Sequence, residues 1–266
     1  MELQGKTALL TGATGGIGRA IAKALAERGT TVVASSRKVD ELTELIDSLP
    51  GSGHRSVVAD LALEGAAEQL IADAGQVDVL VANAGLPGTG TIDSFSPDEI
   101  SRALRVNLEA PMRMSRELVP GMLERSSGHL VYIASLAGKA PSPRSAVYNA
   151  TKFGLRGFAF GLRCDLAGSG VGASIVSPGF VRDAGMFADT GAKAPAGMGT
   201  TTPEAVAAGV VRAIERDKHE VAVAPRRLRA VAHLGLATPG LAIRTASGSA
   251  GRKAADQVAS GQAGKR

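Results

Sequence analysis

Short apolar runs alternate with longer stretches of helical period along most of this chain. The runs are rich in Val, Leu and Ala and predict strands at residues 6–11, 30–35, 54–59, 77–82, 129–134, 171–176 and 220–224. The stretches between them predict helices at residues 16–28, 38–49, 62–74, 97–125, 145–167 and 203–216. Each strand is almost continuously apolar, which is typical of a parallel sheet covered by helices on both faces. The pattern predicts an α/β fold with a doubly wound, Rossmann-type parallel sheet of about seven strands.

Two stretches interrupt this alternation. Residues 179–202 form a long Gly/Ala/Pro connection, and connections of that length are often lids, so we predict a substrate lid at 184–202. Residues 247–266 are small and polar, which predicts a disordered tail. We therefore expect one catalytic, nucleotide-binding domain over residues 1–246.

The segment 225–246 mixes apolar and basic residues. Eight of the thirty Lys and Arg residues follow residue 224, against one acidic residue, so the formal net charge of +5 belongs to this end of the chain. The segment could form a membrane-surface helix, a wall of the substrate site or a subunit contact. Because no aromatic platform or recognition motif accompanies the charges, we do not expect nucleic-acid binding.

Cysteine content and the N-terminus indicate the compartment. The single cysteine, Cys164, excludes an internal disulfide and a cysteine-based metal cluster. The first residues form a strand pattern instead of a secretion signal, and no apolar stretch is long enough to span a bilayer. We expect a cytoplasmic protein without a metal site.

A glycine-rich turn follows the first predicted strand. The sequence TGATGGIG (11–18) places Gly12, Gly16 and Gly18 where a tight turn, a close phosphate and close helix packing each require glycine. The helix that follows offers unpaired N–H groups to a pyrophosphate. An ordinary strand–helix connection is the alternative, but the position at the first such junction favours a dinucleotide site.

The end of the second strand indicates which dinucleotide. An NAD site normally has an acidic residue there for the ribose 2′-hydroxyl, whereas this chain has Ser35, Ser36, Arg37 and Lys38. A guanidinium can bind a 2′-phosphate, which favours NADP(H) over NAD(H). Solvated charges at a helix start are the alternative.

Small polar residues follow the third and fourth strands. Asp60 could accept a hydrogen bond from the adenine amino group, or could cap the next helix. The turn Asn83-Ala84-Gly85 lies where ligands bind in such sheets, although Gly85 could simply serve the turn.

Tyr148 and Lys152 are four residues apart on a predicted helix and therefore share one of its faces. Alone, such a pair is usually a polar surface contact, and Ser135, thirteen residues earlier, could be a turn serine. Together with TGATGGIG, ANAG (82–85), Asn107 in RVNLEA, Ser135 in YIAS, YNATK and SPG (177–179), they resemble the single-domain branch of the short-chain dehydrogenase/reductase family. The resemblance spans residues 4 to 224.

The resemblance implies an NADP(H)-dependent oxidoreductase that interconverts a carbonyl and a secondary alcohol. In that interpretation Ser135 binds the substrate oxygen, Tyr148 transfers the proton, and Asn107 holds a water that links Lys152 to solvent. Lys152 would bind the nicotinamide ribose and, helped by the oxidised cofactor, lower the pKa of Tyr148. The implied cofactor contacts are Gly12, Thr14, Gly16, Ile17, Gly18, Ser36, Arg37, Asp60, Leu61, Asn83, Ala84, Gly85, Tyr148, Lys152, Pro178, Gly179 and Val181.

Two further positions bear on this interpretation. Pro111 has no N–H to donate to the carbonyl of Asn107, so we expect the helix 97–125 to kink there; bending around the core is the alternative. Asp183 stands where the family commonly has a threonine that bonds the nicotinamide carboxamide, so its role is left open.

The predicted lid suggests the substrate. Met186, Phe187 and Met198 lie among small residues, which suits an apolar ligand such as a 3-oxoacyl group, a steroid-like molecule or an aliphatic ketone. The alternatives are a cofactor-binding regulator or scaffold without redox chemistry, and a lyase or isomerase on the same fold. A homodimer or homotetramer is expected from the resemblance alone.

Overall fold

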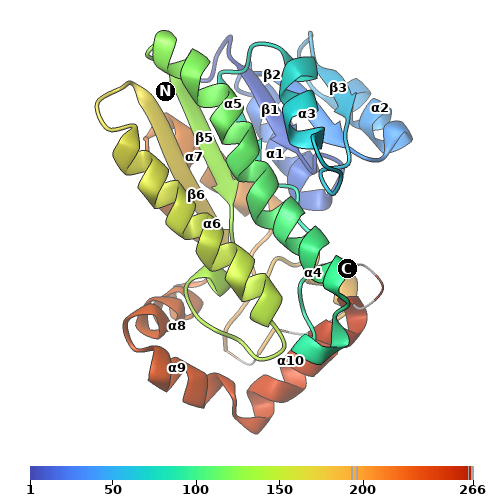
Figure 1. Ribbon diagram of the computed structural model, residues 1–266, viewed down its shortest axis with the longest axis vertical. Coiled ribbons are helices and arrows are strands. Elements are labelled where there is room, and N and C mark those ends of the chain that lie inside the picture. Colours follow the sequence, from blue (N-terminus) through green and yellow to red (C-terminus); the bar gives the residue numbers. More distant parts are fainter. Residues whose placement is uncertain (193, 196, 263, 265–266) are drawn as a thin grey trace.

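The computed structural model describes residues 1–192, 194–195, 197–262 and 264. In this described part of the chain, seven parallel strands form one sheet in the order β3-β2-β1-β4-β5-β6-β7 (Figure 1). The strands are β1 (Thr7–Thr11), β2 (Thr31–Ser36), β3 (Arg55–Val58), β4 (Val79–Ala82), β5 (Gly128–Ile133), β6 (Val171–Pro178) and β7 (Glu220–Val223). Each predicted strand is confirmed, as is the doubly wound α/β fold.

Helices cover both faces of the sheet. One face carries α1 (Gly16–Ala26), α2 (Val39–Ser48) and α7 (Pro203–Glu215). The other carries α3 (Ala66–Ala74), α5 (Ala110–Glu124) and α6 (Ala146–Asp165), with α4 (Pro97–Leu104) leading into α5. In Figure 1, α5 and α6 cross in front of the sheet while α1 and α7 lie behind it.

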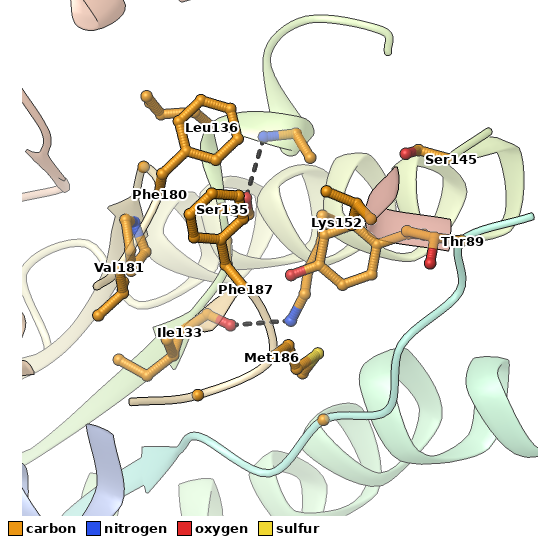
Figure 2. A pocket seen from close by; sticks show the side chains of 18 of the residues that line it. Thr89, Ile133, Ser135, Leu136, Ser145, Lys152, Phe180, Val181, Met186 and Phe187 are labelled. Atoms are coloured by element: carbon orange, nitrogen blue, oxygen red, sulfur yellow. Dashed lines mark hydrogen bonds between the residues drawn. The ribbon is translucent and has the colours of Figure 1, made fainter. Parts of the chain in front are cut away.

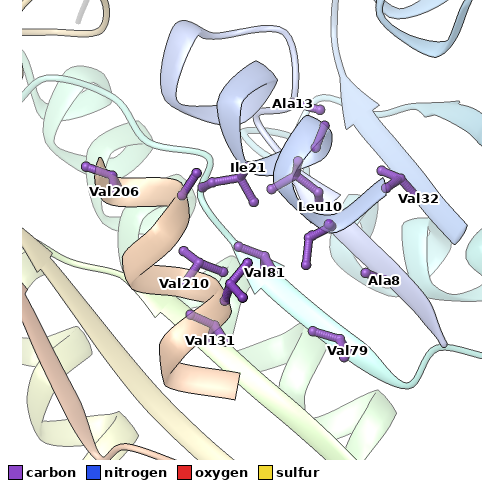
Figure 3. Close-up of a cluster of buried hydrophobic side chains, with 14 of the residues drawn as sticks. Ala8, Leu10, Ala13, Ile21, Val32, Val79, Val81, Val131, Val206 and Val210 are labelled. Carbon is purple, nitrogen blue, oxygen red and sulfur yellow. The ribbon is translucent and has the colours of Figure 1, made fainter. Parts of the chain in front are cut away.

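The core consists of two apolar layers, one on each side of the sheet. Alternate residues of one strand serve opposite layers: Leu10 packs toward α1 and α7, whereas its neighbour Leu9 packs toward α3 and α5. Figure 3 shows the first layer, where Ile21 of α1 and Val210 of α7 approach the strands. Both strand faces are therefore buried, which explains why the strands are apolar without alternation.

The order of the strands reverses direction at β1. This strand pairs with β2 on one side and with β4 on the other. The two connections therefore leave toward opposite sides, which opens a crevice at the carboxyl ends of β1 and β4. Thr11 and Ala82 end these strands and place the glycine-rich turn and Asn83 at this crevice.

The predicted long helix at 97–125 is interrupted as expected. Helix α4 ends at Leu104, residues Arg105–Glu109 form a π-helical turn, and α5 begins at Ala110. Pro111 cannot donate to the carbonyl of Asn107, so the regular ladder of hydrogen bonds cannot continue through this turn. The predicted interruption at Asn107 is confirmed.

The C-terminal part of the chain is helical, and the prediction of a disordered tail is wrong for residues 249–262. Segment 225–246 forms α8 (Arg226–Ala237) and α9 (Pro239–Ala246), and α10 (Ser249–Gln262) follows. The local composition lacks the apolar residues of an independent helix, but α10 packs against the lid and Asp256 pairs with Arg144 at 2.6 Å. Tertiary contacts thus supply what the local sequence lacks. Residues 263, 265 and 266 of the predicted tail lie outside the described residues.

The predicted lid connects β6 to α7. Among its described residues, Ala188–Thr190 form a short 3-10 helix, and the carbonyl of Phe180 accepts a hydrogen bond from the N–H of Thr201 at 2.8 Å. Lys193 and Ala196 lie outside the described residues. No helix in the described part of the chain is long and apolar enough to cross a membrane.

Candidate active site

A cavity of about 960 Å³ opens at the carboxyl ends of the strands. The glycine-rich turn and the ends of β2, β4 and β5 form one part of its wall. The lid and helices α8, α9 and α10 form another part. The cavity is thus built from segments that are far apart in the sequence and meet only because the parallel strands end at the same edge.

The structure brings nearly all of the predicted site residues to this cavity. Ser135, Tyr148 and Lys152 line it, and Asn107 is the predicted residue that does not. The predicted cofactor residues that line it are Gly12, Thr14, Gly16, Ile17, Gly18, Ser36, Arg37, Asp60, Leu61, Asn83, Ala84, Gly85, Pro178, Gly179 and Val181.

The glycine-rich turn has the geometry of a phosphate cradle. Gly12 adopts φ +63°, a conformation that favours glycine, and a Cβ on Gly18 would lie 2.2 Å from the carbonyl oxygen of Gly12. Helix α1 follows Gly15 with no side-chain cap and no acidic residue in its first turn. The N–H groups of this turn are therefore open to an anion, and the turn fits a dinucleotide pyrophosphate.

The lid lies directly on this turn. A Cβ on Gly16 would be 2.1 Å from the Cβ of Ala184, so the lid backbone and the turn are in close contact. Further along the lid, Met186 reaches the β4 end, where its Cε lies 3.2 Å from the place of a Cβ on Gly85. The lid therefore contacts the same glycines that the dinucleotide is predicted to contact.

Polar groups at the ends of β2 and β3 form a second part of the predicted dinucleotide site. Thr14 and Ser36 share a hydrogen bond between their hydroxyls at 2.8 Å, and Arg37 lies 3.8 Å from Asp60. Asp60 also accepts from the N–H of Ala62 at 3.0 Å, which agrees with its capping interpretation. The half-exposed guanidinium and the two hydroxyls fit a 2′-phosphate, which needs several donors.

Thr11 is a supporting residue that the sequence interpretation missed. Its hydroxyl oxygen accepts from the N–H groups of Asn83 and Ala84, both at 3.1 Å. In return, Nδ2 of Asn83 donates to the carbonyls of Thr11 and Gly12, both at 3.0 Å. These bonds fasten the end of β4 to the glycine-rich turn and so fix the crevice between β1 and β4.

Ser135, Tyr148 and Lys152 meet beside the end of β5. Ser135 follows the strand, while Tyr148 and Lys152 share one face of α6, and the Lys152 ammonium lies 5.6 Å from the centre of the Tyr148 ring. Figure 2 shows Ser135, Lys152 and Met186 grouped around the same opening. The three polar side chains can therefore act on one ligand atom.

The surroundings of Tyr148 favour the protonated form of its hydroxyl. Burial raises the pKa of Tyr148 to about 12, although a hydrogen bond with Ser135 acts to lower this pKa. That Lys152, helped by the oxidised cofactor, lowers this pKa stays a prediction, because the value for the protein without cofactor is set by burial and by Ser135. At neutral pH the phenol is protonated and can donate.

Lys152 is buried, and its ammonium has one hydrogen-bond acceptor among the described residues. Its ammonium donates to the carbonyl of Ile133 at 3.0 Å (Figure 2), and its side chain is 3 % exposed. Burial lowers the pKa of Lys152 to about 8. The ammonium is thus charged at neutral pH but needs further oxygen partners to be fully satisfied.

Asn107 does not line the cavity, but it supports the site through hydrogen bonds to Leu86. Its Oδ1 accepts from the N–H of Leu86 at 2.7 Å, and its Nδ2 donates to the carbonyl of Leu86 at 2.9 Å. The side chain is buried, with Thr151 of α6 as a further neighbour. Asn107 therefore clamps the segment after Gly85 to α6, and its predicted role in holding a water stays a prediction.

The segment after β6 separates Val181 from Asp183. Val181 is buried, lines the cavity and pairs with Thr201. Asp183 has φ +70°, is mostly exposed and pairs with Arg182 at 3.2 Å. The structure therefore gives Asp183 a surface ion pair in place of the contact that a threonine would make.

Helices α8, α9 and α10 contribute residues that the sequence interpretation did not name. They include Leu228 of α8, Leu241 of α9, and Ala255, Val258 and Gln262 of α10. Of the three interpretations of segment 225–246, the wall of the cavity is supported by the residues that line it, and the other two stay predictions. A signal was present for α10, because Gly251, Ala255, Val258 and Gln262 follow the i, i+4, i+7, i+11 spacing of one helix face.

A buried ion network anchors α8 to the rest of the site. Lys139, 1 % exposed, lies 3.0 Å from Glu220 and 3.3 Å from Nε2 of His233. Glu220 also pairs with Arg156 of α6 at 3.3 Å. The network links the segment after Ser135 to α8. Among the described residues, no group of His, Cys, Asp and Glu is arranged to hold a metal ion.

Comparison with known proteins gives the family. The family model described as short chain dehydrogenase matches residues 6–195. Ketoacyl reductase HetN of Nostoc sp. is 40 % identical over 227 residues, which cover 83 % of this chain and 79 % of that protein. The 3-oxoacyl-[acyl-carrier-protein] reductase FabG of Escherichia coli is 33 % identical over 68 % of this chain and 75 % of its own length.

A solved structure agrees with these relatives. A metagenomic short-chain oxidoreductase in complex with NADP has a TM-score of 0.68 and 32 % identity, and the match covers 85 % of this chain and 99 % of the other. With more than half of the chain matched by the family model, and with the fold and cavity described above, the assignment is direct. This chain belongs to the short-chain dehydrogenase family of NAD(P)-dependent oxidoreductases, which act on carbonyl and alcohol groups.

Proposed function

We propose that the protein reduces an apolar ketone, such as a 3-oxoacyl group, to a secondary alcohol with NADPH. The observation that carries this proposal is the meeting of Ser135, Tyr148 and Lys152 at the cavity that the glycine-rich turn also lines. A regulator or scaffold without redox chemistry would have no use for a buried lysine beside a protonated tyrosine, because burying an ammonium costs free energy.

In this proposal the cofactor and three side chains each have one role in the reaction. Bound NADPH supplies the hydride for the carbonyl carbon. Tyr148 donates its hydroxyl proton to the carbonyl oxygen, which becomes the alcohol oxygen. Ser135 donates a hydrogen bond that orients this oxygen, and Lys152 holds the ribose and stabilises the phenolate left after transfer. The raised pKa of Tyr148, about 12, keeps its hydroxyl protonated at neutral pH. We propose reduction as the working direction, because a protonated tyrosine is the acid that reduction of a carbonyl needs.

The apolar lining supports an apolar substrate. Phe180 and Phe187 pack with ring centroids 4.8 Å apart, and both line the cavity together with Met186 and Met198. Of the relatives named above, one is named a ketoacyl reductase and one a 3-oxoacyl-[acyl-carrier-protein] reductase, and these names are consistent with a 3-oxoacyl substrate. Aliphatic and steroid-like ketones share the same chemistry and serve as comparison substrates.

The first prediction concerns Tyr148. We expect Tyr148→Phe to lower turnover by roughly 10²–10⁴-fold, because the proton donor is lost, and to leave NADPH affinity largely unchanged. NADPH absorbance with a panel of 3-oxoacyl and aliphatic ketones measures turnover, and fluorescence titration measures affinity. Tyr132→Phe is the matched control, because Tyr132 is the only other tyrosine and its hydroxyl bonds Ser115, away from the cavity. Equal activity in both variants would contradict the mechanism.

The second prediction concerns the cofactor. We expect Arg37→Ala to weaken NADPH binding by roughly tenfold or more while changing NADH binding little, because only NADPH carries the 2′-phosphate. Arg28→Ala is the control, since Arg28 is similarly exposed but pairs with Glu215 outside the cavity lining. Equal losses for both cofactors in Arg37→Ala would count against NADP(H) preference.

Assembly and location complete the proposal. We propose a homodimer or homotetramer that pairs through the helices carrying Asn107 and Tyr148, supported by the exposed apolar side chains of Met112 and Phe153 there. A weak membrane-surface contact through 225–246 is supported by exposed Leu241 and Ile243 of α9. A cytoplasmic location is compatible with the exposed free thiol of Cys164.

A further inference from the structure

Helix α10 lies across the loops that surround the active site. In Figure 1 it runs below the sheet, from the end of α9 to the neighbourhood of α4. Its residue Asp256 pairs with Arg144 of the β5–α6 loop at 2.6 Å. Its last residue, Gln262, contacts both the β4–α4 loop and the lid. One helix therefore joins three loops that come from three different strands.

Gln262 makes the central contacts of this arrangement. Its Oε1 accepts from the hydroxyl of Thr89 at 2.6 Å, and its Nε2 donates to the carbonyl of Met186 at 2.9 Å. The side chain is 4 % exposed, so both bonds are shielded from water. A buried amide with both ends satisfied is expensive to disrupt, because its removal leaves the hydroxyl and the carbonyl without these partners.

The backbone of α10 is shaped for close contact with the lid. A Cβ on Gly261 would lie 2.9 Å from Cα and 2.8 Å from Cβ of Thr190, in the 3-10 turn of the lid. A larger residue would force the helix and the lid apart. Gly261 thus brings the end of α10 near enough for Gln262 to reach Met186.

The face of α10 that lines the cavity is small and apolar. Gly251, Ala255 and Val258 point along one helix face to the cavity, and Gln262 continues the same face. Leu241 and Ala242 of α9 and Leu234 of α8 also line the cavity. We call this part of the cavity, which is lined by apolar residues of three helices, the slot, and α10 is one of its walls.

We propose that α10 is the wall that recognises the aliphatic chain of the substrate, and that Gln262 is the positioning residue that fastens this wall to the lid. The ligand class is a ketone with an extended aliphatic chain, whose carbonyl lies at Tyr148 and whose chain lies against Ala255 and Val258. This substrate assignment rests on the proposed function. The fastening of the lid by Gln262 does not, because it concerns contacts of the protein alone.

The first test measures the fastening without any substrate. Hydrogen exchange of the lid amides at 185–192 is compared in the full chain and in Gln262→Ala, which removes both side-chain bonds. We expect roughly tenfold faster exchange of these amides in the variant, because each lost bond lowers the free energy of opening. Gln257→Ala is the matched control, since Gln257 lies on the same helix but is exposed. Equal lid protection in the two variants would overturn the role of Gln262.

The second test compares KM for two substrates that differ in chain length. In Gln262→Ala we expect KM for a long-chain 3-oxoacyl thioester to rise roughly tenfold more than KM for the acetoacetyl thioester, because only the long chain reaches α10. Ala255→Phe should act in the same sense, because its ring fills the slot without touching the Gln262 bonds. A merely structural role would change both substrates equally, and that result would overturn the proposal.

The two tests separate the possible failures. If the unchanged protein oxidises NADPH with neither substrate, the proposed function fails, while the hydrogen-exchange test still decides the role of Gln262. If it reduces both substrates and neither variant discriminates between them, the proposed function stands and the assignment of α10 to the aliphatic chain fails. Gln262→Glu keeps the acceptor for Thr89 but places a carboxylate oxygen against the Met186 carbonyl, so its lid amides should exchange at least as fast as those of Gln262→Ala.

Discussion

Burial decides the protonation of the two central residues. The tyrosine at 148 loses access to water, so its pKa rises and its proton is retained, while the same loss of water lowers the pKa of Lys152 to about 8. The site therefore has a neutral acid beside a cation whose charge is only moderately favoured. This combination suits donation to a substrate oxygen, and it depends on the depth of α6 in the fold.

The burial of Lys152 gives a prediction for stability. Its pKa is about 8 in the folded protein against an ordinary value of 10.5, so the unfolded chain binds more protons between these values. Stability should therefore rise as the pH increases from about 8 to about 10.5. Lys152→Met should remove the free-energy cost of burying the charged ammonium. The free energy of unfolding at pH 7 should therefore rise by roughly 1–3 kcal/mol.

Urea unfolding of both proteins at pH 7 and pH 10 measures the effect. The advantage of Lys152→Met should shrink at the higher pH, where the native lysine is mostly neutral. Lys6→Met is a suitable control, because Lys6 lies outside the cavity lining and precedes β1. If Lys152→Met and the native protein have the same free energy of unfolding at pH 7, burial of the ammonium costs little stability and the prediction is wrong.

At the scale of elements, the π-helical turn at Arg105–Glu109 positions a side chain that a regular helix would misplace. The turn inserts one residue per turn relative to an α-helix, so the residues on either side of it change face. Asn107 then points at Leu86 and bonds both its N–H and its carbonyl. The turn is thus the reason that a helix residue can hold the loop after β4.

Pro111 is predicted to maintain this turn. In Pro111→Ala an N–H becomes available to the carbonyl of Asn107, which favours a regular helix and should displace the Asn107 amide from Leu86. We expect turnover to fall by roughly tenfold while the free energy of unfolding stays the same or rises by about 1 kcal/mol. Turnover assays and urea unfolding measure the two effects. Pro120→Ala is the control, because Pro120 lies inside α5 beyond the turn, and it should leave turnover unchanged.

The sequence predicted the elements of the sheet well because their signals are local. Continuous apolar runs bounded by Gly and Pro define the strands, and the glycine-rich turn and the YNATK motif lie at fixed places relative to them. Helix α10 was missed because its stability comes from Arg144, Thr89 and Thr190, which lie far away in the sequence. The rise in the pKa of Tyr148 could not be predicted for a similar reason, since burial depends on the packed structure and not on the Tyr–Lys spacing.

At the scale of the whole molecule, the polar site and the apolar slot come mostly from different segments of the chain. The residues predicted to bind the dinucleotide and to carry the chemistry all precede Arg182, whereas the apolar slot is built mostly from the lid and from α8–α10. The family-model match ends at residue 195, before α8 begins. Helices α8–α10 therefore lie outside the matched segment, and we infer that they contribute to substrate choice.

The exposed apolar surface of the molecule predicts its assembly. Met112 of α5 and Phe153 of α6 are 41 % and 38 % exposed, and the two helices cover the same face of the sheet (Figure 1). We expect Met112→Glu combined with Phe153→Glu to convert a dimer or tetramer into a monomer, because charge at a buried contact opposes association. Light scattering measures the mass. Val39→Glu places a charge on an apolar residue of α2 that is more exposed than either of them, and it should leave the mass unchanged.

The position of Gln262 has a practical consequence for anyone who expresses this protein. An affinity tag fused just after α10 would emerge beside the lid and pull on the helix that fastens it, whereas one placed before Met1 would emerge near Ile214, whose carbonyl accepts from the N-terminal amine. A tag at the N-terminus, before Met1, is therefore the safer choice. From the proposed role of α10, we expect protein that carries a tag after this helix to show altered substrate preference, even though every active-site side chain is intact.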